Sequence, residues 1–269
     1  MKTALTIAGS DSGGGAGIQA DLKAFSAQGV FGMSVITAVT AQNTTEVRSV
    51  QNIEFSIIKD QIEAVFDDIR VDAVKIGMLS SADTVDIVAH TLITYKPRFI
   101  VLDPVMVSKA GHHLLQKEAI LALKEKLIPL ATLITPNIPE AEVLTNSKII
   151  TEADMKHACA VMRESGAKTV LLKGGHLNGD PNDLYYDGTD FHWIKGQRIH
   201  TKNTHGTGCT LSSVIAANLA KGATPIEAIQ IAKDYITTAI THSFDLGHGH
   251  GPVHHFYDLY KHAKFASIK

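Results

Sequence analysis

In the stretch Asn203-Thr204-His205-Gly206-Thr207-Gly208-Cys209-Thr210-Leu211, a polar loop with two glycines runs directly into an apolar helical pattern. Glycine lets the backbone come close to a ligand, and the first amides of a helix have no partner within the helix. The helix dipole adds partial positive charge at the same place. The stretch therefore indicates an anion-binding cradle with the Cys209 thiol at its rim. A helix start that Thr207 merely caps is the alternative.

The composition excludes several classes of protein. The chain has 269 residues, of which 45% are hydrophobic, and a formal charge of −2 from 25 basic and 27 acidic residues. It lacks the basic excess of a dedicated nucleic-acid binder, so we expect no nucleic-acid partner. The two cysteines, Cys159 and Cys209, make no disulfide framework, which fits a reducing compartment. With no secretory signal pattern and no apolar run of membrane-spanning length, we expect a soluble cytoplasmic protein without a membrane partner.

Short β-branched runs alternate with longer amphipathic patterns along the chain. We expect strands at residues 4–8, 33–40, 72–76, 99–102, 133–134 and 169–172, and a hairpin that joins 184–186 to 191–193 through Asp187-Gly188. We expect helices around residues 18–25 and at 57–69, 84–92, 119–127, 154–163, 207–220 and 226–240. This alternation predicts an α/β fold with a mostly parallel sheet covered by helices on both faces. No linker or repeat interrupts it, so residues 1–269 are expected to form a single domain.

Polar groups recur where the predicted strands end, and ligands of open parallel sheets bind at the carboxyl ends of strands. These groups are Gly9-Ser10-Asp11, Gln42-Asn43, Gly77-Met78, Asp103, Asn137 and Lys173. The sequence therefore predicts one site along this edge of the sheet.

The glycine-rich loop from Gly9 to Gly17 follows the first strand. Its Gly15-x-Gly17-x-x-Ala20 pattern matches a dinucleotide-binding fingerprint, but the second strand ends in Ala41-Gln42-Asn43 and not in the acidic residue that this fingerprint needs. No Gly-Lys-Ser/Thr sequence occurs, which excludes a P-loop. Close approach of the loop backbone to a small ring is the favoured interpretation. Asp21 borders the inner face of the next helix, or is an ordinary first-turn acid.

Asp103, Glu140 and Lys173 suggest phosphate chemistry. Carboxylates at strand ends can hold Mg²⁺ beside a triphosphate, and an ammonium group can reach phosphate oxygens. The alternatives are a capping box between Asn137 and Glu140 and a solvated lysine at a strand end. Taken with the anion cradle, these groups supply the positioning and the charge stabilisation that phosphoryl transfer needs.

The segment from Gly247 to His255 contains four histidines among glycines. No cysteine or carboxylate ligand lies close to them in the sequence. We expect this segment to form a wall around the substrate, or to pack as a loop, and not to hold a metal.

These motifs resemble the hydroxymethylpyrimidine kinase/phosphomethylpyrimidine kinase family of thiamine biosynthesis, a branch of the ribokinase superfamily. The resemblance runs essentially end to end and rests on residues 5–23, 75–79, 102–106, 134–141, 173–176, 201–210 and 251–255. It implies a ribokinase-like three-layer α/β/α sandwich and a homodimer. It also implies ATP-dependent phosphorylation of 4-amino-5-hydroxymethyl-2-methylpyrimidine, and then of the monophosphate so formed.

The resemblance also implies roles for individual residues. The pyrimidine pocket would contain Gly9, Asp21, Gln42, Met78 and Val105. Cys209 would be the catalytic residue, beside the Gly206 and Gly208 amides and Lys173. The nucleotide would meet Asn137, Glu140, Lys173 and Thr207, and Mg²⁺ would meet Asp103 and Glu140.

Two positions separate this chain from its neighbours in the superfamily. Sugar kinases carry an aspartate base where Cys209 stands, which argues against a sugar kinase. Some family members carry glutamate where Gln42 stands. Related pyridoxine kinases share much of the pattern, so pyridoxine or pyridoxal is the alternative substrate. Because Cys209 lies at a helix start, we expect the dipole to lower its thiol pKa. An NAD-type oxidoreductase and a non-catalytic pyrimidine-binding protein remain rival classes.

Overall fold

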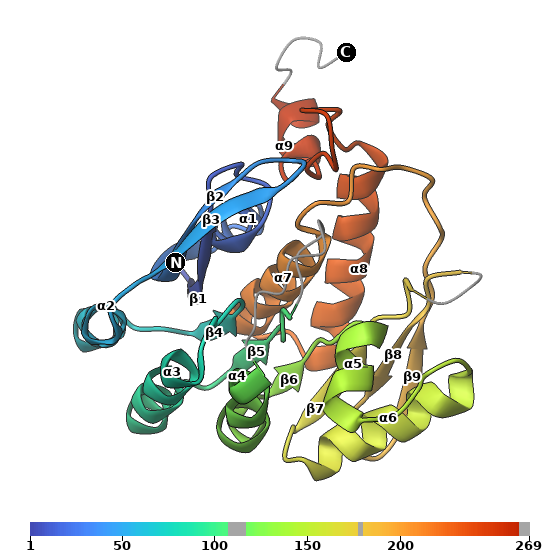
Figure 1. Cartoon of the computed structure of the whole chain (residues 1–269). Helices are drawn as coiled ribbons and strands as arrows, with labels where there is room; N and C mark the ends of the chain where they lie inside the picture. Colours follow the sequence, from blue (N-terminus) through green and yellow to red (C-terminus); the bar gives the residue numbers. More distant parts are fainter. Residues whose placement is uncertain (107–116, 177–179, 264–269) are drawn as a thin grey trace.

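The computed structural model describes residues 1–106, 117–176 and 180–263 (Figure 1). Within these ranges, the strands are β1 (Thr3–Asp11), β2 (Phe31–Gln42), β3 (Val47–Asn52), β4 (Ala73–Ile76), β5 (Ile100–Leu102), β6 (Leu133–Ile134), β7 (Thr169–Leu172), β8 (Asp183–Tyr186) and β9 (Phe191–Ile194). They form one sheet in the order β3-β2-β1-β4-β5-β6-β7-β8-β9. The six strands from β2 to β7 in this order are parallel, whereas β3, β8 and β9 pair antiparallel. The predicted mostly parallel sheet is confirmed.

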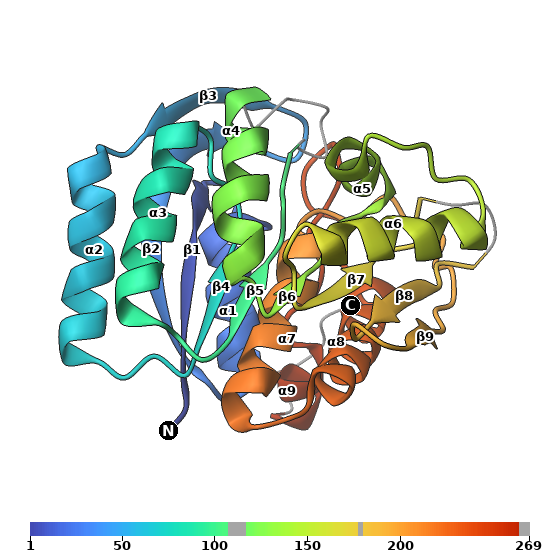
Figure 2. The same cartoon turned by 90° about the horizontal axis from the view of Figure 1, so that it is seen from below.

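Helices cover both faces of the sheet. The described helices are α1 (Gly17–Ala27), α2 (Phe55–Asp68), α3 (Ala82–Tyr95), α4 (Lys117–Ala122), α5 (Ile138–Thr145), α6 (Glu152–Glu164), α7 (Thr207–Lys221), α8 (Pro225–Thr241) and α9 (Tyr257–His262). A π-helical turn, Leu123–Leu127, and a 3₁₀ turn, Ile128–Leu130, continue α4. Figure 2 shows α2 to α6 along one face and α1, α7 and α8 along the other. The predicted α/β/α layering is therefore confirmed.

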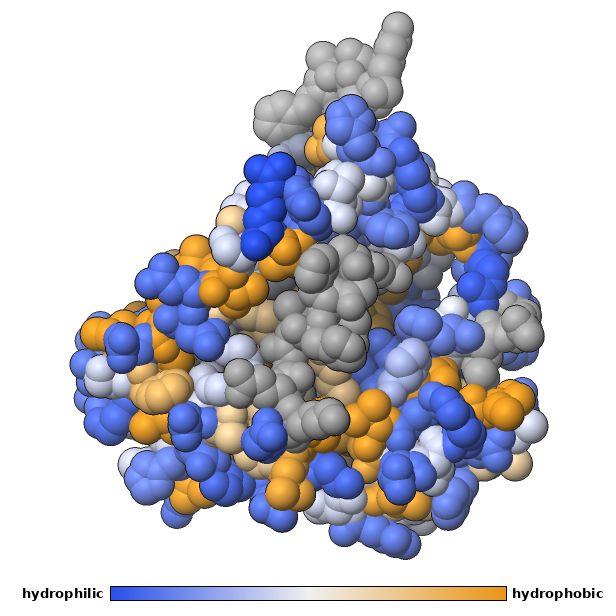
Figure 3. Space-filling view, in the orientation of Figure 1, coloured by the Kyte–Doolittle hydropathy of each residue, from blue (hydrophilic) through white to orange (hydrophobic). Residues whose placement is uncertain are grey.

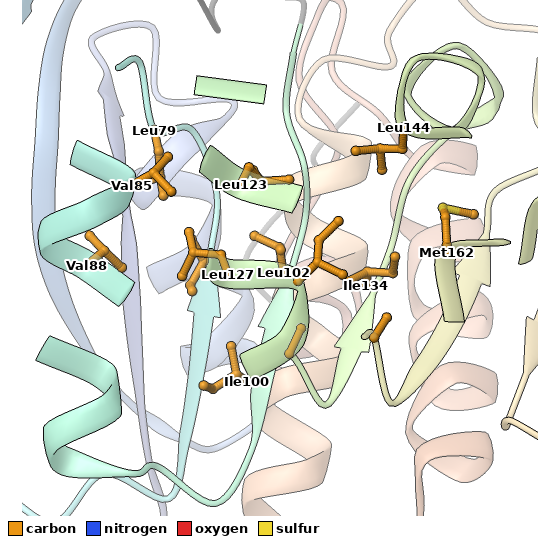
Figure 4. Close-up of a cluster of buried hydrophobic side chains, with 14 of the residues drawn as sticks. Leu79, Val85, Val88, Ile100, Leu102, Leu123, Leu127, Ile134, Leu144 and Met162 are labelled. Carbon is orange, nitrogen blue, oxygen red and sulfur yellow. The ribbon is translucent and has the colours of Figure 1, made fainter. Parts of the chain in front are cut away.

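Each face of the sheet has its own buried core. Between the sheet and α2 to α6, the core includes Leu102, Val88 and Leu127, which point into the space that the sheet and these helices enclose (Figure 4). The opposite core joins α1, α7 and α8 to the sheet and includes Phe25, Val214 and Ile229. Since α7 packs against the centre of the sheet, its first turn is held at the carboxyl ends of β1, β4 and β5.

Three elements differ from the sequence-based expectation. β3 was not predicted because Val47–Asn52 is an edge strand whose side chains are mostly exposed, so no apolar alternation marks it. The short helix α9 has no fully buried residue and carries no helical stripe. α5 was expected only within the capping-box alternative, and that alternative is confirmed below.

The surface shown in Figure 3 has hydrophobic residues in separate groups between hydrophilic ones. In the described ranges, none of the helices combines the length and the apolar character that crossing a membrane requires.

Candidate active site

The start of α7 forms the predicted cradle. Gly206 is its N-cap, with a φ of 77°, and no side chain caps the helix. A Cβ on Gly206 would lie 1.7 Å from the Gly15 carbonyl oxygen, so only glycine fits there. The Thr207 hydroxyl donates to the Thr204 carbonyl oxygen at 3.1 Å and caps nothing. The alternative of a helix capped by Thr207 is therefore wrong, and within the described part of the chain no side chain caps this helix start.

Lys173 and Asp103 form an ion pair beside this turn. Lys173 Nζ lies 2.9 Å from Asp103 Oδ1, which also accepts from the Thr135 hydroxyl at 3.1 Å. A Cβ on Gly208 would stand 3.4 Å from Lys173 Nζ and 3.5 Å from Asp103 Oδ2, which places both charges against the cradle. The Lys173 side chain is only 15% exposed, so the alternative of a solvated lysine is wrong. Burial acts to raise the pKa of Asp103, but the lysines around it, Lys173 foremost, lower it overall.

Asn137 and Glu140 form a capping box at the start of α5. The Asn137 Oδ1 accepts from the Glu140 amide at 2.9 Å, and Glu140 Oε2 accepts from the Asn137 amide at 2.8 Å. The capping-box alternative is therefore confirmed, and Glu140 is also close enough to Lys173 and Asp103 for the three groups to influence one another electrostatically. Burial raises the pKa of Glu140 to about 7, and Asp103 adds to this while Lys173 opposes it.

The donors near Lys173 fit a magnesium ion that retains water. Within the described ranges, Asp103 Oδ2 has only a long contact, 3.4 Å, from the Ser212 hydroxyl, so it can accept a further ligand. Asp103 and Glu140 offer oxygen donors, which Mg²⁺ prefers. Among the described residues no group of three or more His, Cys, Asp or Glu could hold a metal, so water and phosphate oxygens would complete the shell.

Cys209 is half-buried at the rim of the cradle. Burial, helped by Asp21 and Asp103 and opposed by Lys75 and the Gly17 amide, raises the pKa of its thiol to about 11. The expected lowering of the thiol pKa is therefore wrong, because loss of hydration outweighs the positive groups that oppose it. The sulfur carries its proton at neutral pH.

Four of the residues predicted for the pyrimidine pocket lie at the carboxyl ends of four neighbouring strands, β2, β1, β4 and β5. A Cβ on Gly9 would be 2.4 Å from the Met78 Cε, so the thioether side chain packs directly over Gly9. Gln42 is half-buried; its backbone exchanges two hydrogen bonds with the Ser12 hydroxyl, at 2.7 and 2.8 Å, which fixes it beside the glycine-rich loop. Val105 is half-buried just after β5.

Asp21 lies beneath this pocket and exposes no surface. Its carboxylate pairs with Lys75 Nζ at 2.8 and 2.9 Å and accepts from the hydroxyls of Thr6 at 2.6 Å and Ser213 at 2.7 Å. α1 has no acidic residue in its first turn, so the first-turn alternative is wrong. The carboxylate instead connects β1, β4 and α7 under the site.

Two residues of this region, Lys75 and His205, had no role assigned from the sequence, and Asp11 was predicted only as one of the polar groups at a strand end. Lys75, on the fully buried strand β4, had a visible signal, since it interrupts an apolar run. The pairing of Asp11 with His205 had no local signal, because the two residues are 194 positions apart. The Asp11 carboxylate accepts the amides of Gly13, Gly15 and Ala16. Those amides are the groups that a dinucleotide pyrophosphate would need, so the fingerprint interpretation loses its donors.

The histidine-containing segment packs as a wall at the same edge. The His250 amide donates to the Thr44 carbonyl oxygen at 3.0 Å, and the His205 amide donates to that of Gly251 at 3.1 Å. The His255 ring contacts the Thr210 hydroxyl at 2.9 Å, and burial lowers the His255 pKa to about 4.

Comparison with known proteins places the chain in a family. Residues 11–254 match the model of the phosphomethylpyrimidine kinase family. The chain is 50% identical over 262 residues to the hydroxymethylpyrimidine/phosphomethylpyrimidine kinase of Rhizobium meliloti, covering 96% of this chain and 98% of that one. It is 54% identical over 252 residues to a thiamine biosynthesis bifunctional protein of Geobacter sulfurreducens, covering 93% of this chain but about half, 51%, of that longer protein.

Solved structures give the same fold. An ADP complex of Bacillus subtilis pyridoxal kinase superposes with a TM-score of 0.89 at 42% identity, covering 95% of this chain and 98% of that one. Pyridoxal kinase of Staphylococcus aureus with AMP-PCP and pyridoxal gives a TM-score of 0.88 at 33% identity, covering 95% and 93%. With this fold, and with the family match over most of its length, the chain belongs to the phosphomethylpyrimidine kinase family.

Proposed function

We propose that this protein transfers the γ-phosphoryl group of ATP to 4-amino-5-hydroxymethyl-2-methylpyrimidine, and then to the resulting monophosphate. The product is the pyrimidine pyrophosphate of thiamine biosynthesis. The uncapped first turn of α7, with Lys173 and Asp103 against it, carries this proposal. Such a turn offers amides to the charge that develops on the transferred phosphoryl oxygens.

The residues of the site have separate roles in the proposed phosphoryl transfer. The acceptor oxygen lies near Cys209 and approaches the phosphorus in line. The amides from Gly206 to Cys209 hold the equatorial oxygens, and Lys173, already raised in pKa by Asp103 and Glu140 against the effect of burial, brings a permanent positive charge. Asn137 and Thr207 would contact the nucleotide. Mg²⁺ held by Asp103 and Glu140 would supply further neutralisation of the β- and γ-phosphates.

The protonated state of Cys209 shapes the mechanism. A phosphoryl transition state that is largely dissociative needs little removal of the acceptor proton before bond formation. The thiol can therefore orient the acceptor hydroxyl, while the amides and Lys173 provide most of the rate acceleration by stabilising the transition state. This assignment makes the cradle, more than a thiolate base, the centre of catalysis.

Pyridoxal is a second candidate acceptor. The observation that favours it is the high structural similarity to two pyridoxal kinases over 95% of this chain. An ATP-coupled assay across hydroxymethylpyrimidine, its monophosphate, pyridoxine and pyridoxal separates the two. We expect turnover with both pyrimidines, and turnover with pyridoxal alone would overturn the proposal.

We further propose that the protein works in the cytoplasm as a homodimer. Its two free cysteines suit a reducing compartment, and the family resemblance implies the dimer. Light scattering coupled to size-exclusion chromatography gives the mass directly: a value close to twice 28.9 kDa is expected, and 28.9 kDa itself would show a monomer.

A further inference from the structure

One carboxylate holds the glycine-rich loop in shape. Asp11 Oδ1 accepts the Gly13 amide at 2.8 Å, and Oδ2 accepts the amides of Gly15 at 3.1 Å and Ala16 at 2.8 Å. The same Oδ2 contacts His205 Nε2 at 2.8 Å. Asp11 is 3% exposed and His205 is 8% exposed, so water does not compete effectively for these bonds.

His205 links the glycine-rich loop to the opposite side of the site. It directly precedes Gly206, the N-cap of the cradle, and its amide donates to the Gly251 carbonyl oxygen at 3.1 Å. A parallel bridge pairs it with Pro252. His205, which belongs to the loop before α7, thus bonds the glycine-rich loop through its side chain and the segment from Gly247 to Pro252 through its backbone.

The segment from Gly247 to Pro252 is in turn bonded to Thr44, close to Gln42 of the proposed acceptor pocket. The Gly249 amide donates to the Thr44 hydroxyl at 3.2 Å, and the His250 amide donates to the Thr44 carbonyl oxygen at 3.0 Å. Thr44 stands two residues after Gln42, whose backbone is fixed to Ser12 of the glycine-rich loop. The Asp11–His205 contact therefore lies within a closed ring of bonds around the presumed acceptor pocket.

The charge state of Asp11 makes this contact strong. Burial acts to raise the pKa of Asp11, but the hydrogen bond and charge of His205, with the loop amides, lower it overall. Because an ionised carboxylate only accepts, Nε2 of His205 must carry the proton of this bond. Charge-assisted bonds of this kind are roughly twice as strong as neutral ones.

We infer that Asp11 and His205 are a positioning pair, which fixes the acceptor-binding loop against the phosphate cradle and so aligns the acceptor hydroxyl for in-line transfer. The inference rests on the proposed kinase function. Neither residue touches the reacting atoms; each acts through the backbone, His205 on Gly206 and Asp11 on Gly13 to Ala16. A misplacement of about 1 Å between reacting groups can cost about 10²-fold in rate.

The test compares His205→Leu, which removes the donor, with His205→Gln, whose amide nitrogen reaches nearly as far as Nε2. Asp11→Asn is a second disruption that preserves shape. For each folded protein, confirmed by its melting curve, the rates of ADP release and of phosphorylated pyrimidine formation are measured together, with KM for ATP.

In the Leu and Asn variants we expect phosphorylated pyrimidine formation to fall about 10- to 100-fold, with KM for ATP changed less than about twofold. ADP release to water is not limited by acceptor alignment, so the ratio of ADP released to pyrimidine phosphorylated should rise. His205→Gln should restore the wild-type ratio. An unchanged ratio, with both rates reduced in proportion, would show a merely structural role and overturn the inference. A wild-type protein that phosphorylates no pyrimidine would instead overturn the proposed function.

Discussion

Lys75 and Asp21 form an ion pair in which neither side chain exposes any surface, and the pair lies directly beneath the candidate active site. Lys75 stands on β4 and Asp21 on α1, and Ser213 of α7 donates to the same carboxylate at 2.7 Å. Burial opposes the charge on Lys75, but Asp21, together with Asp103 and Cys209, raises the lysine pKa overall. The charge pair joins α1 to β4, and the Ser213 hydroxyl links α7, the helix that forms the cradle, to this pair.

Removal of one partner of this pair should be costly. Lys75→Met leaves the Asp21 carboxylate buried without its counter-ion, which typically lowers the free energy of unfolding by about 3–5 kcal/mol. The double variant Lys75→Met/Asp21→Asn removes both charges and should be clearly more stable than the single variant. Urea denaturation of the three proteins measures this, and a single variant as stable as the double one would contradict it.

Cys209 should react slowly with alkylating agents at neutral pH. Burial raises the pKa of its thiol to about 11, so the reactive thiolate is scarce at pH 7. The rate of modification by iodoacetamide should keep rising well above pH 9. A Cys159→Ala background leaves one thiol to follow, although Cys159 is itself buried, with a pKa raised by burial to about 12. A rate that levels off below pH 8 would restore the helix dipole as the dominant influence.

Stability should fall in mild acid through His255. Its folded pKa of about 4 lies below the ordinary value of 6.5, so between these values the unfolded chain binds a proton that the folded chain does not. This contribution is fully present above about pH 6.5 and is lost as the pH falls toward 4. In His255→Gln the melting temperature should therefore depend less on pH across this range. Parallel curves for the two proteins would rule out His255 as the source.

Gln42 should control the affinity for the acceptor. An aminopyrimidine presents a ring nitrogen beside an amino group, and a glutamine amide offers a matching donor and acceptor. Gln42→Leu leaves that edge unpaired at a cost of about 1–3 kcal/mol, or about ten- to a hundred-fold in KM for the pyrimidine, with little change in KM for ATP. Because Ser12 bonds only the Gln42 backbone, the loop should keep its shape. Equal effects on both KM values and a lowered melting temperature would mean that Gln42 serves the fold.

Local sequence signals predicted the elements that frame the site, but not the pairs inside it. α7 was expected at 207–220 and extends over Thr207–Lys221, because glycines and an apolar stripe mark both its start and its face. The edge strand β3 lacked such a stripe. Asp21 could be placed on the inner face of its helix, yet Lys75 is 54 residues away, and Asp11 lies 194 residues from His205. Such partners depend on the topology of the sheet.

The pKa of Cys209 also depends both on a local feature and on the whole fold. The helix start that predicts a lowered pKa is a local feature and was read correctly. Burial of the thiol depends on the whole fold, and it raises the pKa instead. Residue types and spacing therefore indicated which groups gather at the site, whereas the packing around them determines their charge.

The most direct measurement is to identify the products that the folded protein forms from ATP, Mg²⁺ and 4-amino-5-hydroxymethyl-2-methylpyrimidine, by mass spectrometry with ADP followed in parallel. The account predicts that the pyrimidine monophosphate forms first and the pyrophosphate follows, with one ADP released for each phosphoryl group transferred. Lys173→Met, which removes the positive charge beside the cradle, should slow both steps. If the wild-type protein yields neither phosphorylated pyrimidine, the central claim is contradicted.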